Sequence, residues 1–375
     1  MKNNRRNVVD FFKLAAPGVR ALDPYQPGKP LAELAREHGI TDAVKLASNE
    51  NPLGPGPRAR AAIRAGCADI GRYPDGGGYA LKQALAARLA IGHDRITLGN
   101  GSNDVLELAA RSFVTCSHQV IFSQHAFAVY ALATQAIGAE AVVTPARAYG
   151  HDLGAMRSAI NARTRLIFVA NPNNPTGTWI DEQGLLKFIQ CVPPRVVIVL
   201  DEAYFEYVQA PGYPNGVRWI DRFPNLVVTR TFSKIHGLAG LRVGYAVSHP
   251  QVAELMNRVR QPFNVNSVAL AAAEAALADE EHVATSVAVN TAGLARLTRA
   301  CEALGLGYIP SVANFLCIEL GPRARDLYEA LLRRGVIVRP IANYGLPNHL
   351  RITVGTEREN TRFIDALRQA LNELP

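Results

Sequence analysis

The sequence predicts an α/β protein with a mostly parallel sheet covered by helices, followed by a second, smaller α+β domain. Short β-branched runs alternate with Ala- and Leu-rich amphipathic stretches, which is the pattern of strands joined by crossover helices. Several of the expected strands are apolar on successive residues, as strands buried on both faces are. After about residue 262 the pattern changes to a long Ala-rich helical region and shorter strands.

The individual elements follow from this pattern. The strands expected in the large domain are Arg95–Leu98, Gln119–Phe122, Ala141–Val143, Leu166–Ala170, Val196–Leu200, Leu226–Thr229 and Val243–Val247. Helices expected between them include Asn103–Phe113, Tyr130–Ile137 and Glu182–Gln190. The elements expected in the small domain are a helical region at Ser267–Leu304, strands at Phe315–Leu320, Val336–Arg339 and Leu350–Thr353, and a closing helix at Glu359–Leu374. We therefore expect an N-terminal arm with a short helix (1–45), a large domain (46–262) and a small domain (263–375).

Length and composition indicate a globular enzyme. The chain has 375 residues, of which 48% are hydrophobic and 19% charged, so it can form two domains and is not disordered. Its apolar runs are far shorter than the ~20 residues of a transmembrane helix. The N-terminus carries charges where a secretory signal would have an apolar core. We expect a cytoplasmic protein with no membrane partner.

The charge and the cysteines narrow the possible ligands. The net charge is +8, but the basic residues are scattered, which favours a small anionic substrate over nucleic acid. The five cysteines show no CxxC pair and their number is odd. This usage indicates a reducing compartment and argues against a zinc site, so we expect no metal.

Polar residues that follow the buried strands form the candidate site, because ligands lie outside the carboxyl ends of the strands in an open parallel sheet. The segments that follow four of the strands are Gly99–Asp104, Asn171–Gly177, Asp201–Tyr204 and Arg230–Lys234. They offer, in order, an anion cradle, amide side chains, a carboxylate with a phenol, and a lysine among hydroxyls. Together these groups indicate a site more strongly than any one of them alone.

Each segment also has a structural interpretation. The glycines before Asp104 fit a tight strand–helix turn as well as a phosphate-binding helix N-terminus, and an aspartate in place of a third glycine disfavours a nicotinamide site. Asp201 fits a buried salt bridge or a partner for a pyridinium nitrogen. Lys234 fits an ion pair or a carbonyl nucleophile with a lowered pKa. The nearby residues that suit phosphate oxygens are Thr231, Ser233 and Arg242.

The ordered motifs NPNNPTG, DEAY and SKIHGLAGLR resemble those of the fold-type I aminotransferases that depend on pyridoxal 5'-phosphate (PLP). The resemblance covers nearly the whole chain, from about Pro24 to Leu371. In finer detail the chain resembles the histidinol-phosphate aminotransferase family, through the motifs PYQPGKP, KLASNENPLGPGP, RYPDGGGYALKQALA and YGLPNHLRITVGT. One departure is His125-Ala126-Phe127, where the family often has Pro-Thr-Phe or Pro-Thr-Tyr. The implied large domain has a mostly parallel, seven-stranded sheet.

The resemblance also implies roles for individual residues. Lys234 would form an imine with PLP and move the proton during catalysis, Asp201 would pair with the pyridine nitrogen, and Phe127 would stack on the ring. Asn174 and Tyr204 would bind the 3-oxygen of the ring. The residues implied to hold the phosphate are Ser102, Asn103, Thr231, Ser233, Arg242 and, from the neighbouring subunit, Tyr73. The residues implied to bind substrate are Tyr25, Asn49, Arg339 and Arg351, the last as the receptor for the carboxylate of glutamate or 2-oxoglutarate.

The implied function is a ping-pong transamination in histidine biosynthesis by a homodimer. It interconverts L-histidinol phosphate and 2-oxoglutarate with imidazole-acetol phosphate and L-glutamate. An aromatic amino acid aminotransferase or a phosphothreonine-type decarboxylase would use the same fold. Two alternatives come from other classes: a ligand-sensing regulator, for which the ~45 residues before the core are too few to hold a DNA-binding domain, and an NAD-dependent oxidoreductase, which a visible spectrum would distinguish.

Overall fold

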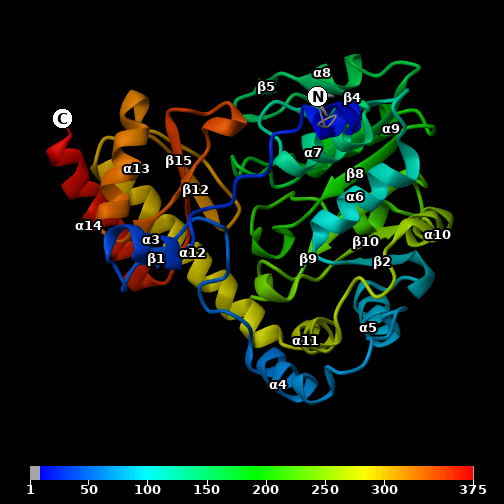
Figure 1. Ribbon diagram of the computed structural model, residues 1–375, viewed down its shortest axis with the longest axis horizontal. Helices are drawn as coiled ribbons and strands as arrows, with labels where there is room; N and C mark the ends of the chain where they lie inside the picture. Colours follow the sequence, from blue (N-terminus) through cyan, green and yellow to red (C-terminus); the bar gives the residue numbers. More distant parts are fainter. Residues whose placement is uncertain (1–8, 375) are drawn as a thin grey trace, which may run out of the picture.

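The computed structural model describes residues 9–374, and its largest element is a seven-stranded sheet (Figure 1). The strands in their order across the sheet are β2 (Ile96–Gly99), β10 (Gly244–Ser248), β9 (Leu226–Thr231), β8 (Val197–Asp201), β7 (Thr164–Ala170), β3 (Gln119–Ser123) and β4 (Glu140–Thr144). All neighbouring strands run parallel except β10, which is antiparallel to both of its neighbours. The expected fold class and the seven expected strands are confirmed, with small shifts at the strand ends.

Helices cover both faces of this sheet. The helices on one side, here called the α7 face, are α6 (Ser102–Phe113), α7 (Ala128–Ile137) and α10 (Pro250–Val259). The helices on the other side, the α9 face, are α4 (Pro57–Gly66), α5 (Tyr79–Leu89), α8 (Leu153–Ser158), α9 (Glu182–Cys191) and α11 (Ser267–Leu277). Side chains of a strand alternate between the faces. In β8, Val197 and Val199 pack on the α7 face, and Ile198 and Leu200 pack on the α9 face.

The helical region expected at 267–304 consists of two helices, α11 and α12 (Glu280–Ala303), which are separated at Ala278 and Asp279. Helix α11 packs against α4 and α5, and its alanines lie in the core of the large domain. The division between the domains therefore differs from the one expected after residue 262. Alanine side chains allow close packing of helices, and composition alone does not show which domain provides the packing surface.

The small domain has a four-stranded antiparallel sheet with helices beside it. Its strands, in order across the sheet, are β11 (Tyr308–Ile309), β12 (Phe315–Glu319), β15 (His349–Thr353) and β14 (Arg339–Pro340). Its helices are α12, α13 (Ala324–Arg333) and α14 (Glu357–Glu373). Helix α14 begins earlier than expected because Thr356 and Glu359 form a capping box across its first turn.

The N-terminal segment connects the two domains. It contains α1 (Phe11–Leu14), α2 (Pro17–Arg20), α3 (Leu31–His38) and β1 (Val44–Lys45). Helix α2 contacts α7 of the large domain, whereas β1 pairs in parallel with β13 (Val336–Ile337) of the small domain. Figure 1 shows this segment, in blue, running from the neighbourhood of α7 to α3 beside the small domain. The segment therefore contributes to the small domain as well as forming an arm.

The remaining elements are short. They are the hairpin β5 (Ala146–Arg147) and β6 (Gly150–His151) and the 3₁₀ turns η1 (Cys67–Asp69), η2 (His93–Arg95), η3 (Phe205–Tyr207), η4 (Gly216–Trp219), η5 (Ala239–Leu241), η6 (Gly321–Arg323) and η7 (Ala342–Tyr344). Among residues 9–374, no helix combines the length and the hydropathy that a membrane crossing requires.

Glu202 and Arg230 form a buried ion pair on the α9 face, at the end of β8. Glu202 is fully buried, and its carboxylate accepts hydrogen bonds from Arg230 Nε and Nη2 at 3.0 and 2.7 Å and from the Gly216 N–H at 2.8 Å. The guanidinium of Arg230 also lies 3.6 Å from the centre of the Phe205 ring. Burial raises the pKa of Glu202, and the charge of Arg230 opposes that effect. The negative charge of Glu202 is therefore balanced by Arg230 within the core.

We expect Arg230→Met to lower the free energy of unfolding by about 3–5 kcal/mol, because it leaves the buried carboxylate of Glu202 without its cation. Urea unfolding followed by circular dichroism measures this change. The matched control is Arg258→Met, which removes an exposed ion pair with Glu254 and should cost no more than ~1 kcal/mol. Equal costs for the two variants would contradict the assignment, and Glu202→Gln combined with Arg230→Met should recover part of the loss.

Candidate active site

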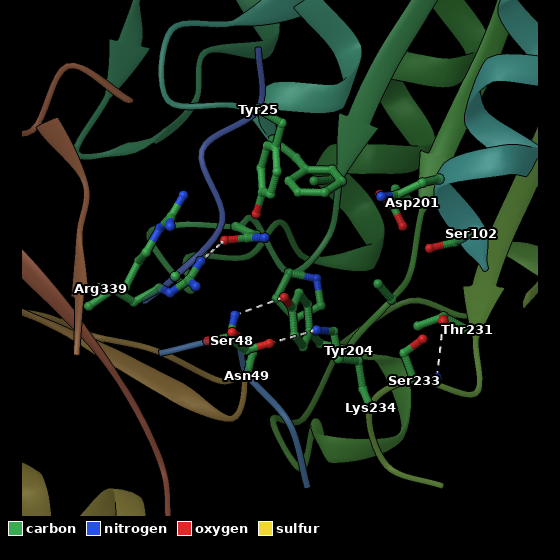
Figure 2. Close-up of a pocket in the computed structure, with 18 of the residues that line it drawn as sticks. Tyr25, Ser48, Asn49, Ser102, Asp201, Tyr204, Thr231, Ser233, Lys234 and Arg339 are labelled. Atoms are coloured by element: carbon green, nitrogen blue, oxygen red, sulfur yellow. Dashed lines mark hydrogen bonds between the residues drawn. The ribbon is translucent and has the colours of Figure 1, made fainter. Parts of the chain in front are cut away.

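The carboxyl ends of the parallel strands open into one pocket between the two domains (Figure 2). All the site residues expected from the sequence line this pocket except Tyr73. They are Tyr25, Asn49, Ser102, Asn103, Phe127, Asn174, Asp201, Tyr204, Thr231, Ser233, Lys234, Arg242, Arg339 and Arg351. Tyr73 instead lies on the surface, 82% exposed, and stacks on Phe263 with the ring centres 4.6 Å apart.

Asp201 is the carboxylate that faces the pocket. It ends β8 and lies two residues after Val199, so strand alternation directs it to the α7 face, opposite to Glu202. Its Oδ2 accepts a hydrogen bond from the Tyr130 hydroxyl at 2.8 Å, and its Oδ1 accepts one from Thr229 Oγ1 at 3.2 Å. Burial raises the pKa of Asp201, whereas these two donors favour the ionised form.

Lys234 lies in the loop after β9, and its amine is buried in the pocket. Its Nζ donates to the carbonyl oxygen of Ser48 at 3.1 Å. Burial lowers the pKa of Lys234 to about 7, and the positive charge of Arg351 is the second largest cause of this shift. A lysine with such a pKa is largely uncharged just above neutrality, so its nitrogen lone pair is free to attack a carbonyl carbon.

Tyr204 and Asn49 connect the pocket to the small domain. Asn49 Nδ2 donates to the Tyr204 hydroxyl oxygen at 2.9 Å (Figure 2). Asn49 Oδ1 accepts from Thr353 Oγ1 at 3.1 Å. Asn49 has φ 55°, a left-handed conformation that asparagine tolerates better than most residues. The Tyr204 ring packs edge-on against Phe315 of β12. Burial raises the pKa of Tyr204, so its hydroxyl stays protonated near neutral pH.

An anion cradle lies where α6 begins. The first N–H groups of this helix, at Ser102 and Asn103, follow Gly101, whose φ is 80°. A Cβ at Gly101 would lie 2.2 Å from Arg242 Nη2, so the glycine is required for the guanidinium to approach. Arg242 Nη1 donates to Ser233 Oγ at 3.1 Å. Helix N–H groups, a hydroxyl and a guanidinium together are a donor set that suits a phosphate group.

Two arginines form the opposite wall. Arg339 in β14 and Arg351 in β15 are paired positions of adjacent antiparallel strands, and both are buried, at 6% exposure. Arg351 Nη2 donates to the Ala47 carbonyl at 2.9 Å, and its Nη1 contacts Asn174 Oδ1. Its buried Nε has no hydrogen-bond partner among residues 9–374. Arg339 donates to the Gln26 carbonyl and lies near the Tyr25 ring. Like charges at paired positions repel each other, so this wall favours an anionic ligand.

The residues that line the pocket but were not expected from the sequence are Gly28, Ala47, Ser48, Tyr130, Ala170, Pro172 and Ala203. Among them, Ala47 hydrogen-bonds to Arg351, Ser48 to Lys234 and Tyr130 to Asp201. Ser48 contributes through its backbone carbonyl, which carries no signal in the identity of the side chain. Tyr130 lies three residues, or about one helical turn, after Phe127. This spacing from an expected ring-stacking residue was the signal that could have placed Tyr130 on the same side of the helix. The structure also shows Asn174 contacting Arg351, a contact that no motif indicated.

A buried lysine, a buried carboxylate and an anion cradle at the strand ends of a mostly parallel sheet are the arrangement of a fold-type I PLP enzyme. The family model described as aminotransferase class I and II matches residues 41–367, and the chain belongs to this family.

Individual relatives agree with this assignment. Histidinol-phosphate aminotransferase 1 of Nitrosococcus oceani is 58% identical over 363 residues, covering 97% of this chain and 98% of that protein. Histidinol-phosphate aminotransferase 2 of Pseudomonas aeruginosa is 56% identical, covering 96% and 99%. The crystal structure of histidinol-phosphate aminotransferase from Sinorhizobium meliloti in complex with PLP has a TM-score of 0.89 at 30% identity, covering 96% of this chain and 98% of that one.

The described residues fit PLP in three respects. The cradle at Gly101 holds donors for a phosphate, and a side chain at that position would fill it. Asp201 offers a carboxylate whose side-chain donors in the described part of the chain are hydroxyls, so its negative charge is available to a protonated ring nitrogen. Lys234 offers an amine whose pKa of about 7 suits reaction with an aldehyde.

The lowered pKa of Lys234 gives a direct prediction. In cofactor-free protein, competitive acetylation of Lys234 should rise with a midpoint near pH 7, because the amine reacts only when it is unprotonated. Mass spectrometry measures the extent of acetylation relative to Nα-acetyl-lysine, an internal standard whose side-chain amine is free. Arg351→Gln should move the midpoint upward, since it removes a nearby positive charge, whereas Arg368→Gln on the exposed side of α14 should not. A midpoint near the ordinary value of about 10.4 would contradict the assignment.

Proposed function

We propose that this chain is a PLP-dependent aminotransferase that interconverts L-histidinol phosphate and 2-oxoglutarate with imidazole-acetol phosphate and L-glutamate. The observation that carries the proposal is the pair of buried arginines, Arg339 and Arg351, which face the same pocket as the amine of Lys234. They supply two positive charges beside the reacting nitrogen. The names of the relatives that are 52–58% identical over nearly the whole chain support the same substrate.

We assign the cofactor contacts as follows. PLP, when bound, supplies an electron sink for the bond that breaks at the substrate Cα. Asp201 accepts a hydrogen bond from the protonated pyridine nitrogen, and Phe127, the N-cap residue of α7, packs against the ring. Tyr204 and Asn174 bind the 3-oxygen of the ring. The residues that bind the phosphate are Ser102, Asn103, Thr231, Ser233 and Arg242.

Lys234 has two tasks in this proposal. Its uncharged Nζ would bond to the aldehyde carbon of PLP, and the aldehyde oxygen would leave as water. The pKa of about 7 makes the uncharged amine available near neutrality. Once the substrate amine has displaced it, the same Nζ would take the proton from Cα and deliver it to C4′ of the cofactor, and the second half-reaction would run this transfer in reverse. A base with a pKa close to the working pH carries out both directions of transfer well.

The substrate contacts follow from the arginine wall. Two molecules use the pocket in turn: glutamate, which has a side-chain carboxylate, and histidinol phosphate, which has a phosphate and no carboxylate. The planar fork of Arg351 suits oxygens of both groups. Arg339 and Tyr25 add a charge and a hydroxyl for the larger anion, and Asn49 lines the pocket between them and Lys234.

We expect histidinol phosphate to have a kcat/KM at least ~10-fold above that of phenylalanine with 2-oxoglutarate as acceptor, a gap of about 1.4 kcal/mol in transition-state binding. Unphosphorylated histidinol should lose most of this advantage. Arg351→Ala should impair both half-reactions, Arg351→Lys less so, and the exposed Arg368→Ala should leave both unchanged. Single-turnover spectroscopy separates the half-reactions. If phenylalanine or tyrosine is the better donor, an aromatic amino acid aminotransferase replaces this proposal.

We also propose a homodimer in which Tyr73 binds the cofactor phosphate of the partner subunit. Tyr73 and Phe263 are both exposed and stack on each other, so they form a small cluster of exposed aromatic side chains. Such a cluster is typical of a protein–protein interface. The five cysteines, none of which is bonded to another in the described residues, support a reducing compartment, and we propose the cytoplasm.

Complementation between variants tests the shared site. Mixing Tyr73→Phe with Lys234→Ala should restore activity, because a hybrid dimer contains one pocket with both native residues. Mixing Arg242→Ala with Lys234→Ala is the matched control and should restore none, since those two residues line the same pocket of one chain. Recovery is measured as transaminase activity after subunit exchange. Absence of recovery together with a monomer in light scattering would overturn the proposal.

A further inference from the structure

Tyr130 occupies a buried position between the cofactor-binding face and the core. It belongs to the first turn of α7 and has no exposed surface. Its ring stacks on Phe168 with centres 4.5 Å apart and an angle of 3° between planes, and it meets the Phe127 ring edge-on at 5.9 Å. These contacts fix the ring, and the hydroxyl then lies 2.8 Å from Asp201 Oδ2.

The hydroxyl of Tyr130 can act only as a donor toward Asp201. Burial and the negative charge of Asp201 raise the pKa of Tyr130 well above 10, so the phenol keeps its proton. The side-chain donors to Asp201 are two hydroxyls, from Tyr130 and Thr229, rather than a cation. Glu202, the neighbouring carboxylate, has Arg230 as its partner and adds negative charge nearby.

We propose that Tyr130 is a positioning residue for the transamination: its hydroxyl keeps Asp201 ionised and oriented, so that the shared proton stays on the pyridine nitrogen. This inference rests on the proposed function. Without the Tyr130 hydroxyl, Asp201 becomes more basic, and the proton moves from the ring nitrogen to a carboxylate oxygen. No other bond changes. Because the unprotonated ring withdraws fewer electrons, catalysis then slows although substrate still binds.

Tyr130→Phe isolates this role because phenylalanine preserves the ring that stacks on Phe168 and contacts Phe127. Tyr207→Phe is the matched control, since Tyr207 is also buried, at 3% exposure, but belongs to a different cluster on the small-domain side. A second replacement, 3-fluorotyrosine at position 130, retains the shape and the hydroxyl and makes the phenol a stronger donor. It keeps the test available if the loss of the hydroxyl impairs folding.

The experiment loads each protein with PLP labelled with ¹⁵N in the ring and records the nitrogen chemical shift and the dissociation constant. We expect a protonated ring in the native protein and in Tyr207→Phe. Tyr130→Phe should move the shift toward that of an unprotonated ring and weaken PLP binding about tenfold, the usual effect of losing a hydrogen bond to a charged group. Its kcat should fall while KM for histidinol phosphate stays constant. The fluorinated protein should change binding in the opposite direction.

The outcomes separate the two proposals. If the native protein takes up no PLP, the proposed function fails. If the native protein shows a protonated ring and Tyr130→Phe shows the same nitrogen shift and PLP affinity, the role of Tyr130 is overturned while the proposed function stands. A Tyr130→Phe protein that raises KM alone, with the nitrogen shift unchanged, would likewise overturn it.

Discussion

Two adjacent carboxylates end the central strand of the sheet, and the rest of the site depends on how each is compensated. A buried anion is costly unless a cation or strong donors meet it. Strand alternation sends Glu202 to the α9 face and Asp201 to the α7 face. Glu202 meets the full positive charge of Arg230, whereas the donors to Asp201 among residues 9–374 are neutral: the hydroxyls of Tyr130 and Thr229 and the backbone of Ala203. One carboxylate is thus neutralised within the core, and the other presents its negative charge to the pocket.

The complementary positive groups come from both domains. Arg242 belongs to the large domain, but Arg351 belongs to β15 of the small domain and helps to lower the pKa of Lys234. Asn49 connects the two domains, because its side chain hydrogen-bonds to Tyr204 of the large domain and to Thr353 of the small domain. The chemistry of the lysine is therefore a property of the two domains together. Neither the sheet that positions Asp201 nor the sheet that carries Arg351 would give this amine the same environment alone.

Much of this arrangement could be predicted from the sequence, because it depends on local patterns. The buried strands are apolar over successive residues, and the strand-end motifs fix Asp201 and Lys234 by their position in the chain. Long-range packing could not be predicted. The alanines of α11 fit either domain, the two residues of β1 carry no signal for pairing with β13, and the contact of Tyr130 with Asp201 depends on the register between α7 and β8.

The pairing of Arg339 with Arg351 makes their spacing a property of the small-domain sheet. Paired positions on adjacent strands hold their Cβ atoms about 5 Å apart. The origins of both side chains therefore belong to one sheet of the small domain, whereas Lys234 belongs to the loop after β9 of the large domain. The spacing of the two positive charges is thus set within one domain, and their distance from the amine is set by how the two domains pack against each other.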